Sequence, residues 1–103
     1  MLEVEDVFSS YGRVKVVSVM MESSELNISE ITRRSGISHS SVELHLEFLV
    51  KAGLITEKRF NRIRIFRVNH SSPRASLLQR FLADWRSLAS SSSSSPAAEM
   101  AFN

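Results

Sequence analysis

The sequence predicts a mainly α-helical chain with one small β-hairpin, an α+β fold that ends in an added helix. Three stretches indicate this. Residues 27–53 carry the start and stop signals of two helices joined by a short turn. Residues 54–68 change to β-branched and aromatic residues around a polar turn, and residues 73–88 return to the spacing of an amphipathic helix. At 103 residues with 43% hydrophobic content, the chain fits one domain.

Composition excludes several classes of protein. The chain has no cysteine, so disulfides, thiol nucleophiles and cysteine-ligated zinc are excluded, and we expect an intracellular protein. Its acidic N-terminus lacks the basic region of a secretory signal, and its longest apolar-rich run, residues 14–21, is too short to span a bilayer. The sequence offers no nucleophile–base pair, carboxylate pair or glycine-rich phosphate loop. We therefore expect no enzyme, no cofactor and no membrane contact.

Charge is distributed unevenly along the chain, although its net value is only +2. Residues 1–30 hold six acids and two bases, a net charge of −4. Residues 31–67 hold eight bases and three acids, a net charge of +5. The positive charge therefore coincides with the predicted helix pair and hairpin. This distribution indicates a polyanionic partner, the alternative being that the cations only solvate a surface.

Two predicted elements precede the helix pair. Residues 2–9 space their apolar side chains as a short amphipathic helix, which Tyr11-Gly12 ends. Residues 13–22 are apolar nearly all round, and their valines also suit a strand, so periodicity alone does not separate the two. A buried helix is favoured because the length suits one and a helix pair follows the polar loop at residues 23–26.

Each helix of the pair has its own start and stop signals. Asn27 is a suitable cap, with a glutamate three residues on that can reach back, and Gly36 suits the left-handed residue that ends the first helix. Ser38 caps the second helix, predicted over residues 39–52 and ended by Gly53. Its apolar positions lie at i, i+4, i+7 and i+8, and they are Val42, Leu46, Leu49 and Val50. The polar first turn stays exposed, a shape suited to a DNA major groove.

Residues 54–60 and 62–68 are predicted to pair as a hairpin around Asn61. On the second strand, Ile63 and Ile65 fall on one face, whereas Phe66 shares the other face with arginines. We expect the inward face to switch partway, so that Phe66 packs down while the arginines near the tip point outward. The cations gathered at that end are Lys58, Arg59, Arg62 and Arg64.

The terminal helix is predicted to start at Pro73, after the cap Ser72, and to end at about Leu88. Four of its apolar side chains follow the 3-4-3 spacing of a coiled-coil seam, and these are Leu78, Phe81, Trp85 and Leu88. A helix this apolar must be buried against its own domain or against a second subunit. Residues 90–103 begin with a serine run and predict a flexible tail, which leaves residues 1–89 as the folded domain.

The order of helix, helix pair, basic hairpin and terminal helix is that of a winged helix. Within residues 26–55 the chain also reads L-x-I-S-E-I, then G-I-S-x-S-x-V-x-x-H-L-x-x-L, then A-G-L-I. This pattern resembles the ArsR-type winged helix-turn-helix, and the likeness covers about residues 13–70. The resemblance implies a winged helix-turn-helix with an added C-terminal helix, and binding to DNA. The matching residues are Leu26, Ile28, Ser29, Glu30, Ile31, Gly36, Ile37, Ser38, Ser40, Val42, His45, Leu46, Leu49, Ala52, Gly53, Leu54 and Ile55.

The chain departs from the metal-sensing members of that family. Those members carry a cysteine pair on the recognition helix, or acidic and histidine ligands on the terminal helix. Here there is no cysteine, and residues 73–88 contain no histidine and one acid, Asp84. We therefore predict no metal site, and we expect His45 to pack or hydrogen-bond inside the fold. No small-molecule effector is evident.

The predicted site has a reading part and a gripping part. The residues expected to read base edges are His39, Ser40, Ser41 and Glu43, the alternative being an ordinary solvated turn in which Ser41 assists the cap. Beside them, Leu44 either touches a thymine methyl group or packs. The residues expected on the DNA backbone and in the wing are Arg33, Arg34, Lys58, Arg59, Arg62 and Arg64.

We predict a sequence-specific, double-stranded DNA-binding transcriptional regulator that acts as a homodimer, in the cytoplasm and on the nucleoid. The recognition helix, residues 39–52, would enter the major groove, and the basic wing, residues 57–67, would lie on the flanking minor groove and backbone. Two alternatives remain, a winged-helix protein-interaction module and an architectural chromatin protein without sequence preference. The predicted dimer interface consists of Val4, Val7, Phe8, Leu78, Phe81, Trp85 and Leu88.

Overall fold

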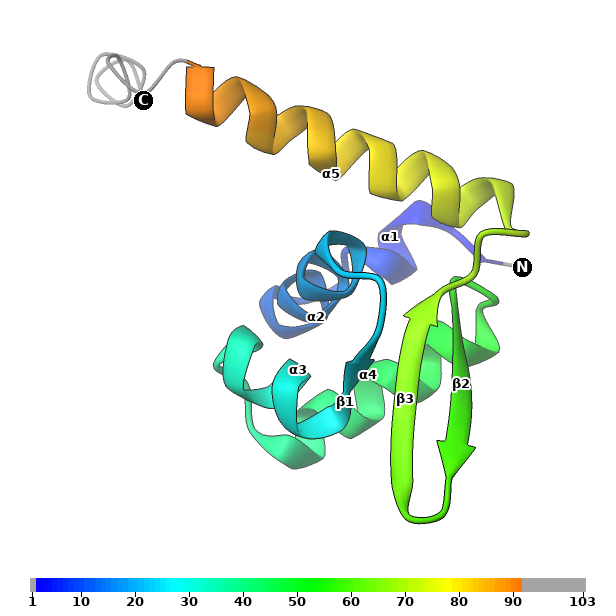
Figure 1. Cartoon of the computed structure of the whole chain (residues 1–103). Coiled ribbons are helices and arrows are strands. Elements are labelled where there is room, and N and C mark those ends of the chain that lie inside the picture. The colour runs from blue at the N-terminus through cyan, green and yellow to red at the C-terminus, as the bar shows by residue number, and fades with distance from the viewer. Residues whose placement is uncertain (1, 92–103) are drawn as a thin grey trace.

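A computed structural model describes residues 2–91, which form a mainly helical fold with a small antiparallel sheet (Figure 1). This confirms the predicted fold class. Within the described part no helix is long and apolar enough to cross a membrane. The helices are α1 (Val4–Val7), α2 (Tyr11–Glu22), α3 (Ile28–Ser35), α4 (His39–Lys51) and α5 (Pro73–Ser91). The strands are β1 (Leu26–Asn27), β2 (Ile55–Phe60) and β3 (Ile63–Val68).

The boundary between the first two helices differs from the prediction. Tyr11 and Gly12 do not break the chain but open α2, because the Ser10 hydroxyl accepts a hydrogen bond from the Arg13 amide at 3.1 Å and caps the helix. Gly12 serves a packing purpose instead. A Cβ atom at this position would lie 3.0 Å from His45 Nε2, so the glycine lets α4 approach α2 closely.

The apolar segment at residues 13–22 is a helix, as favoured over a strand. Its side chains are buried in several directions because α2 contacts α3, α4, α5 and β3. A helix that is apolar on most sides needs neighbours on most sides, which explains its lack of a simple amphipathic stripe. The buried residues of α2 are Val16, Val17, Val19, Met20 and Met21.

The helix pair has the predicted caps. The Asn27 side chain accepts from the Glu30 amide at 2.9 Å, and the Glu30 carboxylate accepts from the Asn27 amide at 3.0 Å. Gly36 ends α3 with φ of 72°, in the left-handed region. In the turn itself, the buried Ser35 hydroxyl accepts a hydrogen bond from the Ile37 amide at 3.3 Å. These hydrogen bonds fix the turn between α3 and α4, and with it the relative orientation of the two helices.

The sheet has one more strand than the sequence predicted. β3 lies in the middle, with β2 on one side and the two-residue β1 on the other, where Leu26 pairs with Phe66. β1 consists of the last residue of the predicted loop, Leu26, and the predicted helix cap, Asn27, and two residues are too few to show an alternating pattern. The hairpin turns tightly at Asn61, whose φ of 56° is the left-handed conformation that asparagine tolerates.

The inward face of the hairpin does not switch partway, contrary to the prediction. Arg64 alternates in register with Phe66 and Val68 and faces the helices with them. Its guanidinium is tolerated there because carboxylates surround it, as described below. The residues nearest the tip on the opposite face, Phe60 and Ile63, are exposed instead.

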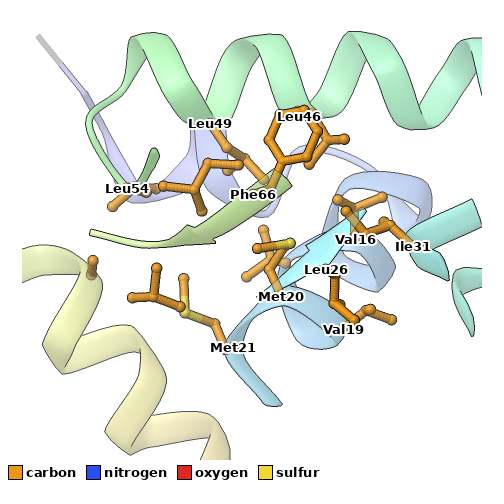
Figure 2. Close-up of a cluster of buried hydrophobic side chains, with 14 of the residues drawn as sticks. Val16, Val19, Met20, Met21, Leu26, Ile31, Leu46, Leu49, Leu54 and Phe66 are labelled. Carbon is orange, nitrogen blue, oxygen red and sulfur yellow. The ribbon is translucent and has the colours of Figure 1, made fainter. Parts of the chain in front are cut away.

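The hydrophobic core lies between the sheet and the helices, around Phe66 of β3 (Figure 2). Phe66 is fully buried and packs with side chains from α2, α3 and α4. One cluster therefore fixes the hairpin against the helix pair. The other labelled members of this cluster are Val16, Val19, Met20, Met21, Leu26, Ile31, Leu46, Leu49 and Leu54.

α5 presents two different faces. Ala75, Leu78 and Leu82 face the body of the protein, and the Gln79 side chain donates to the Met21 carbonyl at 3.1 Å. An adjoining face exposes Leu77, Phe81, Trp85 and Leu88, a 4-4-3 spacing. Leu78 therefore packs inward, and Leu77 takes its place in the exposed stripe.

Two further predictions about the ends of the fold need correction. Val7, predicted at the dimer interface, is only 6% exposed and belongs to the hydrophobic core, whereas Val4 and Phe8 are exposed. The terminal helix continues past Leu88 to Ser91, so the first two residues of the predicted tail are helical. The rest of that tail, residues 92–103, lies outside the described residues.

Two leucines of α4 offer a matched test of this packing. Leu46 is 0% exposed and Leu44 is 66% exposed, although only one residue separates them. We expect Leu46→Ala to lower the free energy of unfolding by about 2–5 kcal/mol, because it leaves a cavity in the core. Leu44→Ala should change it by less than about 0.5 kcal/mol. Equilibrium urea denaturation followed by circular dichroism measures both, and equal losses would contradict this placement of α4.

Candidate nucleic-acid interface

The first turn of α4 carries the residues predicted to read bases. His39 and Ser40 are exposed, and so is Leu44 one turn further on, which therefore does not pack. Ser41 is half-buried, and its hydroxyl accepts a hydrogen bond from the Ser38 hydroxyl at 3.1 Å. Ser41 thus takes part in the helix cap, the alternative considered for it. The exposed surface of this turn is polar with one leucine.

The two arginines of α3 differ in their surroundings. Arg33 is exposed, and within residues 2–91 no ion pair involves it. Arg34 donates to the Ser23 hydroxyl at 2.8 Å and pairs with Glu22 at 3.5 Å, which ties it to the end of α2. Arg33 is therefore the more available of the two for an external anion.

The wing carries cations in two states. Lys58 and Arg62 are exposed, and no ion pair within the described residues involves them. Arg59 is also exposed, although its Nε lies 3.3 Å from a Glu57 carboxylate oxygen. An ion pair this exposed is weak, so water or a phosphate can replace it at little cost. The wing thus keeps three cations available to solvent.

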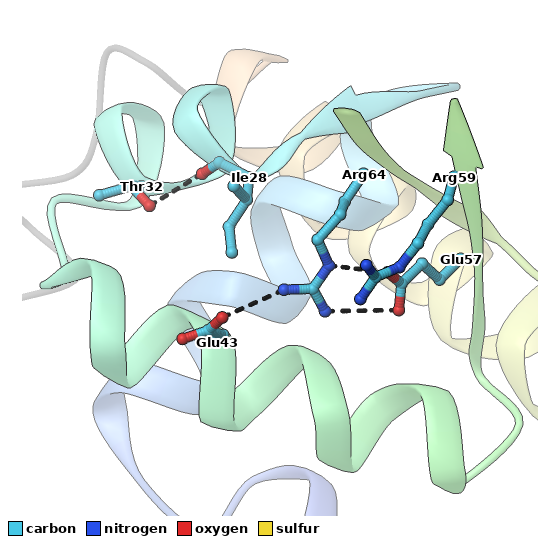
Figure 3. A network of polar contacts seen from close by, with 6 residues as sticks. All are labelled: Ile28, Thr32, Glu43, Glu57, Arg59 and Arg64. Carbon is cyan, nitrogen blue, oxygen red and sulfur yellow. Dashed lines mark hydrogen bonds and ion pairs between the residues drawn. The ribbon is translucent and has the colours of Figure 1, made fainter. Parts of the chain in front are cut away.

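Arg64 is the exception, because it bridges the wing and the recognition helix (Figure 3). Its Nε donates to Glu57 on β2 at 2.7 Å, and its Nη1 donates to Glu43 on α4 at 3.1 Å. The Arg64 side chain is only 20% exposed and also lies over the Phe66 ring at 5.3 Å. Arg64 and Glu43, predicted as separate DNA contacts, therefore bind one another. Sequence reasoning missed this pair because 21 residues separate its members.

This bridge shifts the pKa values of Glu57 and Arg64. Hydrogen bonding from Arg64 is the main cause that lowers the pKa of Glu57 below its usual value, and it outweighs the opposing effect of partial burial. The hydrogen bond to Glu57 in turn raises the pKa of Arg64. The carboxylate of Glu57 is therefore charged throughout the neutral range, and the bridge is intact there.

A second polar contact supports the back of the recognition helix. Arg13 of α2 donates through Nε to His45 Nδ1 at 3.3 Å, and its guanidinium stacks on the Phe48 ring at 3.8 Å. The same side chain donates to the Asp6 carbonyl of α1 at 2.6 Å. Partial burial, and then the charge of Arg13, lower the pKa of His45. His45 is thus a hydrogen-bonded residue of the fold, as expected.

No group of three or more histidine, cysteine or acidic side chains comes together within the part of the chain that the structure describes. The acids instead pair with arginines across element boundaries. Besides the Arg64 bridge, Arg86 of α5 pairs with Glu22 at 3.2 Å, and Arg67 of β3 pairs with Glu25 at 3.5 Å. The acidic residues near the site therefore hold elements together.

Comparison with known proteins identifies a family that part of this chain matches. Residues 10–57 match the family described as "Bacterial regulatory protein, arsR family". This match confirms the resemblance that the sequence predicts, and it is to a family of regulatory proteins and not of enzymes. No curated protein sequence matches the chain.

Solved structures share the fold. HlyU from Vibrio cholerae has a TM-score of 0.66 at 18% identity, over 78% of this chain and 84% of that one. The transcriptional repressor BigR from Xylella fastidiosa has a TM-score of 0.63 at 21% identity, over 75% of this chain and 76% of that one. A homodimeric winged helix-turn-helix DNA-binding domain from Mycobacterium bovis has a TM-score of 0.61 at 16% identity, over 84% and 75%. At these identities the likeness establishes the winged-helix fold.

The Arg64 bridge can be tested through the carboxylate that it holds. In Arg64→Met, the pKa of Glu57 should rise toward its ordinary value, because the main hydrogen bond that favours the charged form is lost. Since the folded-state pKa lies below the unfolded one, Glu57 stabilises the native fold at neutral pH, and this stabilisation is lost as pH falls through the folded-state pKa. Carboxyl-detected NMR titration measures the shift.

Arg59→Met is the matched control, because Arg59 contributes less to the same carboxylate and is far more exposed. It should move the pKa of Glu57 less than Arg64→Met does. Equal shifts in the two variants would contradict the assignment of Arg64 as the bridging residue.

Proposed function

We propose that this chain, whose residues 10–57 form an ArsR-family helix-turn-helix domain, is a transcriptional regulator that binds a specific double-stranded DNA site as a homodimer. One observation carries the proposal. The exposed first turn of α4 and the exposed cations of α3 and the wing belong to the helix-turn-helix and hairpin, whereas the exposed apolar stripe lies on α5 at the other end of the molecule (Figure 1). DNA binding and subunit association thus have separate surfaces.

We assign base reading to the exposed side chains near the start of α4. His39 and Ser40 can exchange hydrogen bonds with base edges in the major groove, and Leu44 can contact a thymine methyl group. Glu43 does not read a base in this proposal, because its carboxylate is already paired with Arg64. Through this pair it holds the wing at a set distance from the reading turn.

Grip on the DNA backbone is assigned to the exposed cations. Arg33 on α3 and the wing residues Lys58, Arg59 and Arg62 can neutralise phosphates on the two sides of the reading turn. Phosphate contacts fix position and orientation but carry no sequence information. In this proposal α3 and the wing supply most of the affinity for DNA, and α4 supplies the selectivity among DNA sequences.

Association is assigned to the apolar face of α1 and α5. Leu77, Phe81 and Trp85 expose one stripe, and Val4 and Phe8 lie across an apolar groove of about 570 Å³ that α1 and α5 enclose. A self-complementary contact here gives a two-fold dimer. A two-fold dimer presents its two recognition helices one DNA turn apart, roughly 34 Å, on a near-palindromic site. The homodimeric relative from Mycobacterium bovis supports this arrangement.

A salt titration on duplex DNA tests the grip. The slope of log K against log salt should be about −0.9 for each phosphate neutralised. Arg59→Gln with Arg62→Gln should weaken binding and make the slope less steep by about 2 per subunit, because two phosphate contacts are removed. Arg80→Gln on exposed α5 is the control that should leave the slope unchanged.

The alternatives give different results in the same assay and in selection of bound sequences from a random duplex pool. A slope near zero for the native chain would contradict DNA binding and favour a protein-interaction module. Tight, salt-dependent binding without any selected sequence would indicate an architectural protein. A selected two-fold symmetric site is the result expected here.

Association is tested by charge on the exposed stripe. Phe81→Glu with Trp85→Glu should convert a dimer to a monomer in analytical ultracentrifugation, because two carboxylates would be buried at the contact. Both side chains are exposed in the subunit, so circular dichroism should show an unchanged fold. Ala83→Glu, exposed on another face of α5, should stay dimeric. A native chain that sediments as a monomer at micromolar concentration would contradict this interface.

A further inference from the structure

The tip of the wing exposes an apolar pair that the fold does not use. Phe60 ends β2 and Ile63 starts β3, and the two are cross-strand partners on either side of the turn. Phe60 is 65% exposed and Ile63 is 54% exposed. Neither residue belongs to the hydrophobic core of the described residues or to the partly buried side chains that pack against it. Exposed apolar area is unfavourable in water, so a cross-strand pair held at a projecting tip is a candidate contact surface.

The surroundings of this pair identify the kind of partner. Arg59 and Arg62 flank the pair directly in the sequence, and Lys58 lies one position further along β2. Among these flanking side chains there is no acid. An apolar centre between cations fits a polyanion that also offers apolar area in a narrow space. The DNA minor groove, with phosphates on both rims and sugars and base steps between them, has this chemistry.

We propose that Phe60 and Ile63 form an apolar wedge that enters the minor groove beside the recognition site and partly unstacks a base step. The inference rests on the proposed function, because it extends the DNA contact of the same wing. Apolar side chains of this kind commonly open base steps when a protein binds the minor groove, and they kink the duplex toward the major groove.

The hairpin is built to present such a wedge. Its ladder is continuous from Ile55 to Phe60, and a tight turn at Asn61 closes the tip, so the end is narrow. The Arg64 bridge to Glu57 and Glu43 lies directly behind the pair and joins it to α4. The tip also projects beyond the helices (Figure 1). The distance between the reading turn and the wedge is therefore set by the fold.

Two consequences separate a wedge from the cationic grip. The wedge selects flexible pyrimidine–purine steps at a position where no side chain reads a base edge. Its contribution to affinity is insensitive to salt, whereas that of Arg59 and Arg62 follows counterion release. Affinity, salt slope and DNA shape thus report on the two contacts independently.

The test compares the native chain with Phe60→Ala and Ile63→Ala combined, on the duplex selected from the random pool. The double variant should bind about tenfold more weakly with an unchanged salt slope, because it loses apolar contact and keeps every cation.

Energy transfer between dyes at the duplex ends should show a bend with the native chain and a straighter duplex with the variant. A 2-aminopurine placed at the flanking step should brighten only with the native chain. Tyr11→Ala, an exposed aromatic residue on α2, is the control and should behave as the native chain does.

Several outcomes would overturn the wedge. An equal bend and equal 2-aminopurine signal in the native chain and the double variant would do so, even if affinity fell. Unchanged affinity would do so as well, and capture of a partner protein that is lost in the double variant while DNA binding persists would assign the tip to that protein. Failure of the native chain to bind duplex DNA with a salt-dependent affinity is a separate result, which rejects the proposed function itself.

Discussion

Burial of α2 on most of its sides is the constraint on which the rest of the structure depends. A twelve-residue helix with valines and methionines facing in several directions is stable in water only when neighbours cover each of those directions. α3 and α4 cover part of it, β3 covers another part, and α5 lies along the remainder. The helix pair, the hairpin and the terminal helix are therefore held in one arrangement by a common need to cover this helix.

The polar residues of the interface follow a second constraint, which is charge balance. The helix-turn-helix and wing concentrate arginines, and cations this close repel one another unless acids lie between them. Glu57 and Glu43 meet this need for Arg64 and leave the cations near the tip and on α3 exposed. Glu57 and Glu43 thus set where the positive field of the candidate interface lies. They also explain why a lightly charged first turn of α4 can coexist with a strongly basic wing.

Local signals in the sequence predicted most of the fold. Caps, left-handed glycines and apolar spacing depend on residues within one or two helical turns, so the Asn27 box, the Gly36 turn and the bounds of α4 follow from the sequence directly. The errors arose where long-range contacts decide. Pairing with Phe66 makes Leu26 a strand residue, and the packing of α5 against the core turns Leu78 inward. The start of α2 is a different case, because the Ser10 cap that makes Tyr11 and Gly12 helical is a local signal. For the site, the exposed cations could be predicted, but the Arg64 bridge depends on how the hairpin packs against α4, which no local pattern encodes.

The contacts of Arg13 have a thermodynamic consequence for the assembly. This one side chain touches α1 through the Asp6 carbonyl and α4 through His45 and Phe48. α1 borders the apolar groove, and α4 carries the reading turn. If a displacement of α1 shifts α4 through Arg13, a partner that orders α1 and a partner that orders α4 each change the affinity for the other by the same factor, because such coupling is reciprocal.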